Sequence, residues 1–576
     1  MIKLMKYFKP MEWLQFFAVI GLVVGVVAID MTLPDYMADI MTKIGTGSTT
    51  LEILQIGAIM LGLSLIEVVF SGTAGFFSAR ISAGLCRTVR ETLFDKVGKF
   101  SMQEINKFST ASLITRSTND ITQLQNTYAI GIRMIFTAPI MAVWAIVKII
   151  GRSGDLSLVT AIFLVAMLLG LISILIFALP KFTKLQKAVD RVNLVTRENL
   201  TGLRVVRAYN AENLQSDKFE DSNTNLSKIN LFLNRMMALL SPFMTLIMSG
   251  LSLTLVWIGA SLIGQNLLDV PSLMAFTQYA TLVLMSFVML SMLFIIFPRA
   301  EVSAKRVREV LNSKSSIEDG TQSFPADIKG KIEFKNVDFA YPNAEAKVLQ
   351  DINFKVDAGE TLAIIGSTGS GKSTIINLLM RFYDITNGEI LIDDTNLKDV
   401  PLHDLYNKIG YIPQKSTLFS GTVAENVGYG LVKKDKQAIN KAIEISQAEE
   451  FVEKLKGKLK YHISQGGNNI SGGQKQRLSI ARALSRKPEF LFFDDSFSAL
   501  DFTTDKKLRD ALKKSSVKST KVIVAQRIGT VMDADKIMVL DNGKMIGFGT
   551  HKQLMKNCKV YRELAYSQLS KEDLAR

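Results

Sequence analysis

Long apolar runs without charged residues constrain the fold of this chain more than any other feature. A helix needs roughly 20 such residues to cross the hydrocarbon core of a bilayer. Three runs meet this length without interruption, Leu156–Leu179, Met236–Leu268 and Val270–Pro298. The remaining candidates are Trp13–Ile29, Met134–Val147 and Ile53–Phe77. We therefore expect an α-helical membrane domain with six transmembrane helices.

The basic residues between these runs predict the orientation of the spans. Lysines and arginines concentrate between the second and third spans and between the fourth and fifth. The opposite loops carry few, Lys43 and Arg152. Because loops rich in Lys and Arg stay in the cytoplasm, both termini are expected there. The two basic segments have helical periodicity, which indicates long cytoplasmic extensions of the spans. No Arg- and Ser-rich presequence precedes the first run, so a bacterial plasma membrane is the expected location.

Two acidic residues fall inside or at the ends of the apolar runs. Ionisable groups in a membrane domain usually face an interior and have a function. Asp30 is a candidate lining residue of a membrane cavity, and a place at the outer interface is an equal alternative. For Glu67, pairing with a neighbouring basic group is the favoured reading.

Composition excludes several classes of protein. The 576 residues are 48% hydrophobic, which is not typical of a disordered chain. Two cysteines and three histidines leave little for a disulfide scaffold or a histidine metal cluster. The net charge is +15, but no basic stripe is interleaved with aromatic residues, so nucleic acid is not an expected partner.

The sequence pattern changes after the last apolar run. Residues 1–311 form the expected transmembrane domain, and the Ser-, Asp- and Gly-rich stretch 312–330 is typical of a linker. From residue 331 to 576, short β runs alternate with helical stretches. This alternation predicts an α/β domain with a largely parallel sheet.

A complete phosphate-binding motif lies early in this second domain. It matches G-x-x-x-x-G-K-[ST], follows the apolar strand Thr361–Ile365 and opens a helix. Backbone N–H groups of such a loop surround phosphates, the Lys reaches the β- and γ-phosphates, and the following hydroxyl binds Mg²⁺. The motif consists of Gly366, Ser367, Thr368, Gly369, Ser370, Gly371, Lys372, Ser373 and Thr374.

Two further motifs complete a nucleotide site. The apolar strand Phe490–Asp494 ends in an acid, and Asp494 is placed to hold Mg²⁺. A second helix start with small residues can also bind an anion; it consists of Ser471, Gly472, Gly473 and Gln474. One nucleotide does not need two such helix starts, so the second one is expected to serve a nucleotide held by a neighbouring molecule.

With Gln414 and the Ser498–Asp501 turn, these motifs resemble an ATP-binding cassette, and the whole chain resembles a half-transporter of the ABC exporter family. The resemblance implies that Tyr341 stacks on adenine. It implies Mg²⁺ contacts from Ser373, Gln414 and Asp494, a D-loop at Asp501, and a signature motif at 471–474 that clamps ATP on the opposite cassette. It also implies coupling helices near Gln103–Phe108 and Tyr209–Asn213.

Two positions depart from the family pattern. Members with a full hydrolytic site have a Glu directly after the acid that ends the Walker B strand, which here is Asp494, and this chain has Asp495 there. They also have a His, called the switch His, at the position where this chain has Gln526. An Asp is shorter than Glu by one C–C bond, about 1.5 Å. A displacement of that order can cost about 10²-fold in rate. The chain is therefore expected to pair, as a heterodimer, with a second half-transporter whose site is competent.

The expected function is ATP-driven export of small hydrophobic or amphipathic compounds, with ATP and Mg²⁺ as cofactors. Export of a lipid or a peptide is the alternative within the same class. A regulatory ATP-binding subunit or an ATP-gated pore, without pumping, is the alternative from another class.

Overall fold

The computed structural model describes residues 1–325, 329–342, 344–433, 435–515 and 518–569. Contacts divide the chain into two compact units. The helical unit comprises Met1–Lys96 and Ala111–Asn312, and the C-terminal unit comprises Val97–Thr110 and Ser313–Arg576. The segment 97–110 thus groups with the C-terminal unit, although the sequence expectation places it within residues 1–311.

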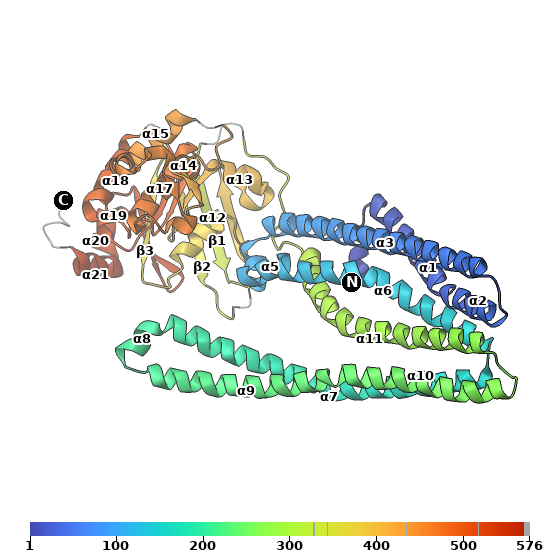
Figure 1. Ribbon diagram of the computed structural model, residues 1–576. Coiled ribbons are helices and arrows are strands. Elements are labelled where there is room, and N and C mark those ends of the chain that lie inside the picture. Colours follow the sequence, from blue (N-terminus) through green and yellow to red (C-terminus); the bar gives the residue numbers. More distant parts are fainter. Residues whose placement is uncertain (326–328, 343, 434, 516–517, 570–576) are drawn as a thin grey trace. The chain divides into compact units, whose positions relative to one another are not determined.

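Long helices and a few short ones make up the helical unit (Figure 1). They are η1 (Ile2–Tyr7), α1 (Pro10–Asp30), α2 (Leu33–Gly45), α3 (Thr50–Gly98), α5 (Thr110–Ser117), α6 (Asn119–Ile150), α7 (Gly154–Thr201), α8 (Leu203–Ala208), α9 (Glu212–Ala238), α10 (Leu240–Gly264) and α11 (Val270–Asn312). Helix α4 (Met102–Phe108) lies in the segment that groups with the C-terminal unit.

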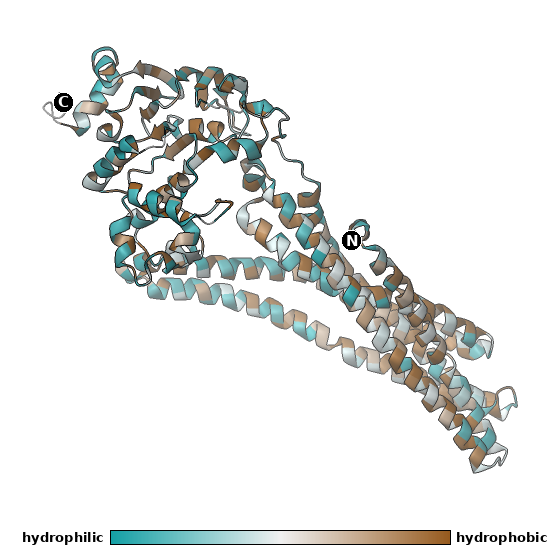
Figure 2. Cartoon of the chain, turned by 90° about the horizontal axis from the view of Figure 1, so that it is seen from above, coloured by the Kyte–Doolittle hydropathy of each residue, from teal (hydrophilic) through white to brown (hydrophobic). Residues whose placement is uncertain are grey.

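Six helical segments of the described chain are long and apolar enough to cross a membrane, as the sequence predicts. Their outer faces carry large exposed hydrophobic residues. On α10, Leu246, Leu253 and Trp257 share one face and are 69%, 69% and 77% exposed. Such a face is stable only against lipid or another apolar surface. Figure 2 shows hydrophobic residues concentrated toward one end of the helices, whereas α7 and α9 carry many hydrophilic residues farther along.

Helix α11 holds much of this unit together by packing on α2, α6 and α10. Its Tyr279 is fully buried and donates a 2.9 Å hydrogen bond to the Met31 carbonyl. Close by, the Asp35 carboxylate of α2 accepts a 2.6 Å hydrogen bond from Lys148 Nζ and pairs with Arg152. These polar contacts join α2, α6 and α11.

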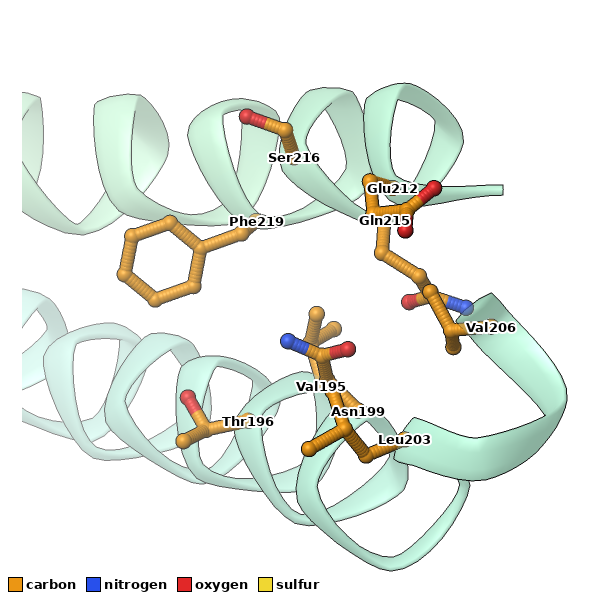
Figure 3. Close-up of a pocket in the computed structure, with 9 residues that line it drawn as sticks. All are labelled: Val195, Thr196, Asn199, Leu203, Val206, Glu212, Gln215, Ser216 and Phe219. Atoms are coloured by element: carbon orange, nitrogen blue, oxygen red, sulfur yellow. The ribbon is translucent and has the colours of Figure 1, made fainter. Parts of the chain in front are cut away.

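A short helix lies between α7 and α9, close to the position where the resemblance implies a coupling helix. It is α8, Leu203–Ala208, which ends directly before the segment Tyr209–Asn213. Gly202 ends α7, and Asn210 takes a left-handed conformation with φ 48° that ends the turn before α9. A cavity of about 400 Å³ lies at this corner. Figure 3 shows Leu203 and Val206 facing side chains from α7 and α9.

The C-terminal unit contains two larger sheets. The first is antiparallel, with the order β2–β1–β4–β5. The second has the order β12–β11–β3–β10–β9–β6 and is parallel except for the edge strand β12. The strands are β1 (Ile332–Phe339), β2 (Leu349–Val356), β3 (Thr361–Gly366), β4 (Asn387–Ile392), β5 (Thr395–Asn396), β6 (Ile409–Ile412), β9 (Phe490–Asp494), β10 (Thr520–Val524), β11 (Lys536–Asp541) and β12 (Lys544–Gly549). A further pair, β7 (Gly421–Thr422) and β8 (His462–Ile463), forms a small ladder.

Apolar strands and helices position the loops of this unit. All five residues of β9 are buried, as expected of a strand covered on both faces. The helices are α12 (Lys372–Leu379), α13 (Leu402–Lys408), α14 (Val423–Val427), α15 (Lys436–Ile445), α16 (Glu449–Lys454), α17 (Gly472–Ser485), α18 (Phe502–Lys514), α19 (Ile528–Val531), α20 (His551–Asn557) and α21 (Lys559–Gln568), with short 3₁₀ turns η2 (Leu397–Asp399), η3 (Lys458–Lys460) and η4 (Gln465–Gly467). One core cluster joins both sheets and α12. The second includes α15, α17 and α18.

Candidate functional site

The loops that follow four neighbouring parallel strands meet at one edge of the large sheet. These strands are β3, β10, β9 and β6, and ligands of open α/β sheets bind at such carboxyl ends. A cavity of about 360 Å³ lies there. Its lining includes many of the residues that the sequence singles out: Tyr341, Thr368, Gly369, Gly371, Lys372, Ser373, Thr374, Gln414, Asp495 and Gln526.

The phosphate-binding loop has the conformation that its glycines permit. Gly369 and Gly371 adopt φ values of 83° and 99°, which a residue with a Cβ rarely takes. Lys372 begins α12, and its Nζ donates hydrogen bonds of 2.9 and 2.6 Å to the carbonyls of Gly366 and Ser367. Among the described residues, the buried Ser370 Oγ has no hydrogen-bond partner. A bound phosphate would supply an acceptor for it.

Two of the three expected Mg²⁺ contacts, Ser373 and Asp494, already touch each other. Ser373 Oγ donates a 2.6 Å hydrogen bond to Asp494 Oδ1. No group of three or more His, Cys, Asp or Glu side chains in the described part of the chain could hold a metal by itself. One hydroxyl and one carboxylate suit Mg²⁺, because this ion takes its other ligands from phosphates and water. The donor set therefore fits a metal that arrives with a nucleotide.

Burial controls the charges of this site. It raises the pKa of Asp494, and the neighbouring Asp495 carboxylate raises it further, while the Ser373 hydrogen bond opposes the shift. Burial also lowers the pKa of Lys372, against the attraction of the two carboxylates. Two adjacent carboxylates that face one ammonium group favour the arrival of a divalent cation.

Two amides hold the side chain of Asp495. Gln526 Nε2 donates a 2.8 Å hydrogen bond to Asp495 Oδ2, and Gln414 Nε2 donates one of 3.2 Å to the same oxygen. The residue is 6% exposed and has a left-handed backbone, φ 46°. Burial raises the pKa of Asp495, and the two amide hydrogen bonds counteract this shift. Gln414 and Gln526 thus lie together at Asp495, a contact that the sequence did not predict.

Tyr341 lies on the wall of the cavity, beside the phosphate-binding loop. Its hydroxyl is 3.1 Å from Thr374 Oγ1 and accepts a 3.4 Å hydrogen bond from Asn377. Two apolar residues, Val348 and Val524, complete this part of the lining. Their side chains carry no chemical signal in the sequence, so motif analysis does not find them.

The second glycine-rich helix start is also formed. Ser471 caps α17 in a reciprocal arrangement, in which Ser471 N donates to Gln474 Oε1 at 2.9 Å. Gly472 and Gly473 open the helix. Asp501 caps α18 by accepting a 2.9 Å hydrogen bond from Thr504 N. Among the described residues, the cavity lining includes none of 471–474, so this helix start is not part of the chain's own cavity.

The last candidate, Asp30, lies in the helical unit as the final residue of α1. It is within electrostatic range of Glu67 on α3. In the portion of the chain that the structure covers, neither carboxylate makes an ion pair with a basic side chain. The pairing of Glu67 with a basic neighbour, favoured from sequence, is thus not seen among these residues.

Comparisons with known proteins identify the family. Residues 349–498 match the profile "ABC transporter", and residues 16–287 match "ABC transporter transmembrane region". An uncharacterised ABC transporter ATP-binding protein of Mycobacterium tuberculosis is 38% identical over 541 residues, or 93% of each chain. The chain belongs to the ABC transporter family. It has the architecture of an exporter half-transporter, with a membrane region fused to a C-terminal ATPase domain.

Other relatives of this ABC exporter chain are named for particular functions. A multidrug resistance ABC transporter ATP-binding and permease protein of Lactococcus lactis is 28% identical and covers 99% of this chain and 95% of its own. An ATP-dependent lipid A-core flippase of Saccharophagus degradans is 29% identical, with coverages of 88% and 86%. The solved structure of a bacterial Atm1-family ABC exporter with ATP bound has the same fold, with a TM-score of 0.82, 22% identity and coverages of 97% and 98%. As an ABC exporter, the chain couples an ATPase to transport.

Proposed function

We propose that this chain is one half of a heterodimeric exporter of small hydrophobic or amphipathic compounds and that its own ATP site hydrolyses slowly. The observation that carries the proposal is the hydrogen bonding of the Asp495 carboxylate. It occupies the position of the general base, yet both amides donate to its Oδ2 oxygen. An oxygen that already accepts two hydrogen bonds is poorly available to take a proton from water.

The geometry of an Asp at this position supports the same conclusion. Its carboxylate stands closer to the backbone than that of a Glu by about 1.5 Å. The backbone is fixed by a 3.0 Å hydrogen bond from Asp495 N to the Val524 carbonyl, so the loop does not shift freely to restore the reach. Gln526 donates a hydrogen bond but carries no charge, so it compensates γ-phosphate charge less than a protonated His does.

Other features of the site favour tight nucleotide binding. The phosphate-binding loop, Lys372 and the Ser373–Asp494 pair would hold ATP with Mg²⁺, and Tyr341 would stack on the base. Mg²⁺ neutralises phosphate charge when bound. In the proposed head-to-tail dimer, Ser471–Gln474 and Asp501 of this chain complete the partner's competent site.

The proposed organisation follows from these roles. Residues 1–311 form the membrane domain, 312–330 a linker and 331–576 the cassette. Both termini lie in the cytoplasm of a bacterium, and the spans cross its plasma membrane. The Lactococcus relative named for multidrug resistance supports the substrate class. The relative named as a lipid A-core flippase makes lipid translocation the second candidate.

The test compares the chain alone with the chain purified together with its native partner. The chain alone should bind ATP and turn it over slowly, because both sites of a self-dimer carry Asp495 and Gln526. The complex should hydrolyse ATP and accumulate a fluorescent lipophilic dye in inverted vesicles. Fast turnover by the chain alone, lost in Asp495→Asn, would falsify the slow-site proposal. Accumulation of a fluorescent phospholipid instead of the dye would favour the flippase candidate.

A further inference from the structure

Helix α21 is held against α19 along one face. Tyr561 and Ala565 of α21 are both fully buried, in the same core cluster as Ile528 of α19. Gln568 follows Ala565 by three positions and Tyr561 by seven, which places the three residues on one side of the helix. Gln568 is also the last residue of α21. The buried pair therefore brings the Gln568 side chain to the start of α19.

The amide of Gln568 spans the loop between β10 and α19. Its Oε1 accepts a 2.8 Å hydrogen bond from Ile528 N, and its Nε2 donates one of 2.9 Å to the Gln526 carbonyl. The first bond satisfies an N–H group at the start of α19, where the N-cap residue Arg527 makes no side-chain cap hydrogen bond. The second bond holds the peptide group of Gln526. One side chain from a separate helix thus fixes two backbone groups, one on either side of Arg527.

The same loop carries a side chain of the nucleotide site. Gln526 Nε2 donates its 2.8 Å hydrogen bond to Asp495 Oδ2. The Arg527 guanidinium donates at 3.3 Å to the carbonyls of Ser498 and Leu500, in the turn after β9. Gln526 is exposed, and an exposed side chain keeps most of its rotamer freedom. Hydrogen bonds to its backbone and to its amide, rather than packing, therefore determine where the Gln526 amide lies.

We propose that Gln568 is a positioning residue that keeps the Gln526 amide on the Asp495 carboxylate and thereby keeps this chain's own site slow. The inference rests on the proposed function, in which Asp495 holds the position of the general base. Without the Gln568 donor, the Gln526 peptide is free to rotate and its amide leaves Asp495 Oδ2. Gln414 still donates to that oxygen. With one donor fewer, the carboxylate is more available to take a proton from water.

The two hydrogen bonds of Gln568 can be separated by chemistry. An amide both donates and accepts, whereas an ionised carboxylate only accepts. Gln568→Glu therefore keeps the bond from Ile528 N and loses the donor to the Gln526 carbonyl, and Gln568→Ala loses both. A carboxylate at a helix start is also favourable, so the Glu variant retains the cap of α19. If Gln568 served only as that cap, Glu would replace it without effect on the reaction.

The test measures phosphate release from radiolabelled ATP, which resolves slow turnover, by the full chain alone in lipid nanodiscs. Gln568→Ala and Gln568→Glu should each raise kcat about two- to tenfold, the range expected for one net hydrogen bond. The KM for ATP should stay within about twofold, because the residues that hold the phosphates are unchanged. Ser567→Ala is the matched control. This exposed serine of α21 donates to the Leu564 carbonyl of its own helix, and its variant should hydrolyse ATP like the parent.

A double-variant cycle tests whether Gln568 acts through Gln526. Gln526→Ala removes the amide from Asp495 and should raise kcat about as much as Gln568→Ala does. In that background there is no amide left to position, so adding Gln568→Ala should leave kcat where Gln526→Ala alone puts it. A purely structural role of Gln568 would instead give the same change in both backgrounds.

Three results would overturn the inference. They are a kcat of Gln568→Ala equal to or below that of the parent, a parent-like kcat in Gln568→Glu, or additive changes in the double variant. Because Gln568→Glu retains the cap of α19, its result holds even if Gln568→Ala is less stable. The kcat of the parent separates this inference from the proposed function. A fast parent contradicts the slow site, whereas a slow parent with unchanged variants contradicts only the role of Gln568.

Discussion

Gln526 and Asp495 form a 2.8 Å hydrogen bond at the edge of the sheet where the site lies. The resemblance to other cassettes implies that residue 526 faces the γ-phosphate, but its amide instead donates to the carboxylate. Gln414 donates to the same oxygen. The two departures from the family pattern are therefore physically coupled and must be tested together.

Replacing both departing residues should create a working site. We expect Asp495→Glu with Gln526→His to raise ATP turnover of the chain alone by about 10²-fold or more, the lower end of what an aligned general base contributes. The longer carboxylate regains its reach, and the imidazole no longer offers the amide that occupies it. Steady-state phosphate release in detergent measures the effect. Asp495→Asn with Gln526→His is the control, and an equal increase there would show that residue 495 is not the base.

Lys372 should dominate the affinity for nucleotide. Its ammonium is held at the phosphate-binding loop by hydrogen bonds to two backbone carbonyls. Lys372→Ala should weaken binding of ATP about 10- to 100-fold, as expected for loss of a charge-assisted contact. Equilibrium binding of a fluorescent trinitrophenyl analogue of ATP measures this affinity. Lys355→Ala, an exposed lysine on β2, should bind like the parent. If both bind equally, the loop is not the phosphate site.

Variants of Ser373 and Ser370 should distinguish binding of the metal from binding of the phosphates. Ser373→Ala removes the hydroxyl that contacts Asp494, so more Mg²⁺ should be needed for half-maximal ATP binding. Binding of ATP in the presence of a chelator should not change. Ser370→Ala should instead weaken ATP binding in the presence of a chelator and leave the Mg²⁺ requirement unchanged. The reason is that the unpartnered Ser370 Oγ is available to phosphate and does not touch Asp494. Identical Mg²⁺ titrations for the two variants would contradict the assignment of Ser373.

Asp494 should destabilise the nucleotide-free protein at neutral pH. Its pKa is raised by burial above the ordinary value of 3.8. A raised pKa means that the folded state binds the proton more tightly than the unfolded state does. Protonation of Asp494 therefore stabilises the fold fully at pH values below the ordinary pKa, and this stabilisation is lost as the pH rises through the raised pKa. Asp494→Asn does not titrate, so its melting temperature should exceed that of the parent at pH 7.5, and the difference should shrink toward pH 4. Thermal unfolding of the full chain in detergent tests this. A difference that grows on acidification would contradict the shift.

The sequence predicted the strand and helix around the glycine-rich loop 366–371 and the strand β9 well, because local rules determine these elements. Four consecutive apolar residues and a terminal acid leave few alternatives to the strand Phe490–Asp494. The bounds of α8 could not be predicted from the sequence, since the breaks on either side depend on Gly202 and on the left-handed Asn210 rather than on a motif. The spacing of apolar residues rarely reveals such breaks, because the helical pattern continues on both sides of them.

Contacts between distant residues were beyond sequence reasoning. The amides on Asp495 come from residues 81 and 31 positions away, on separate loops. The contact between Asn106 and Tyr383 joins residues 277 positions apart. Neither contact has a spacing rule, because each depends on the order of strands in the sheet or on how α4 packs. Motifs identified the participants of the site, and the tertiary fold decided which of them touch.

The grouping of α4 with the C-terminal unit has a practical consequence for dissecting the transporter. A cassette expressed from residue 313 onward lacks the segment that buries Glu104 against Ser316. It also leaves the Tyr383 hydroxyl without its donor from Asn106. Biochemistry on such a fragment would describe a protein with a different surface beside its nucleotide cavity. A fragment that fuses residues 97–110 to the cassette through a flexible tether would keep that surface intact, and it is the smaller unit on which nucleotide binding should be compared with the whole chain.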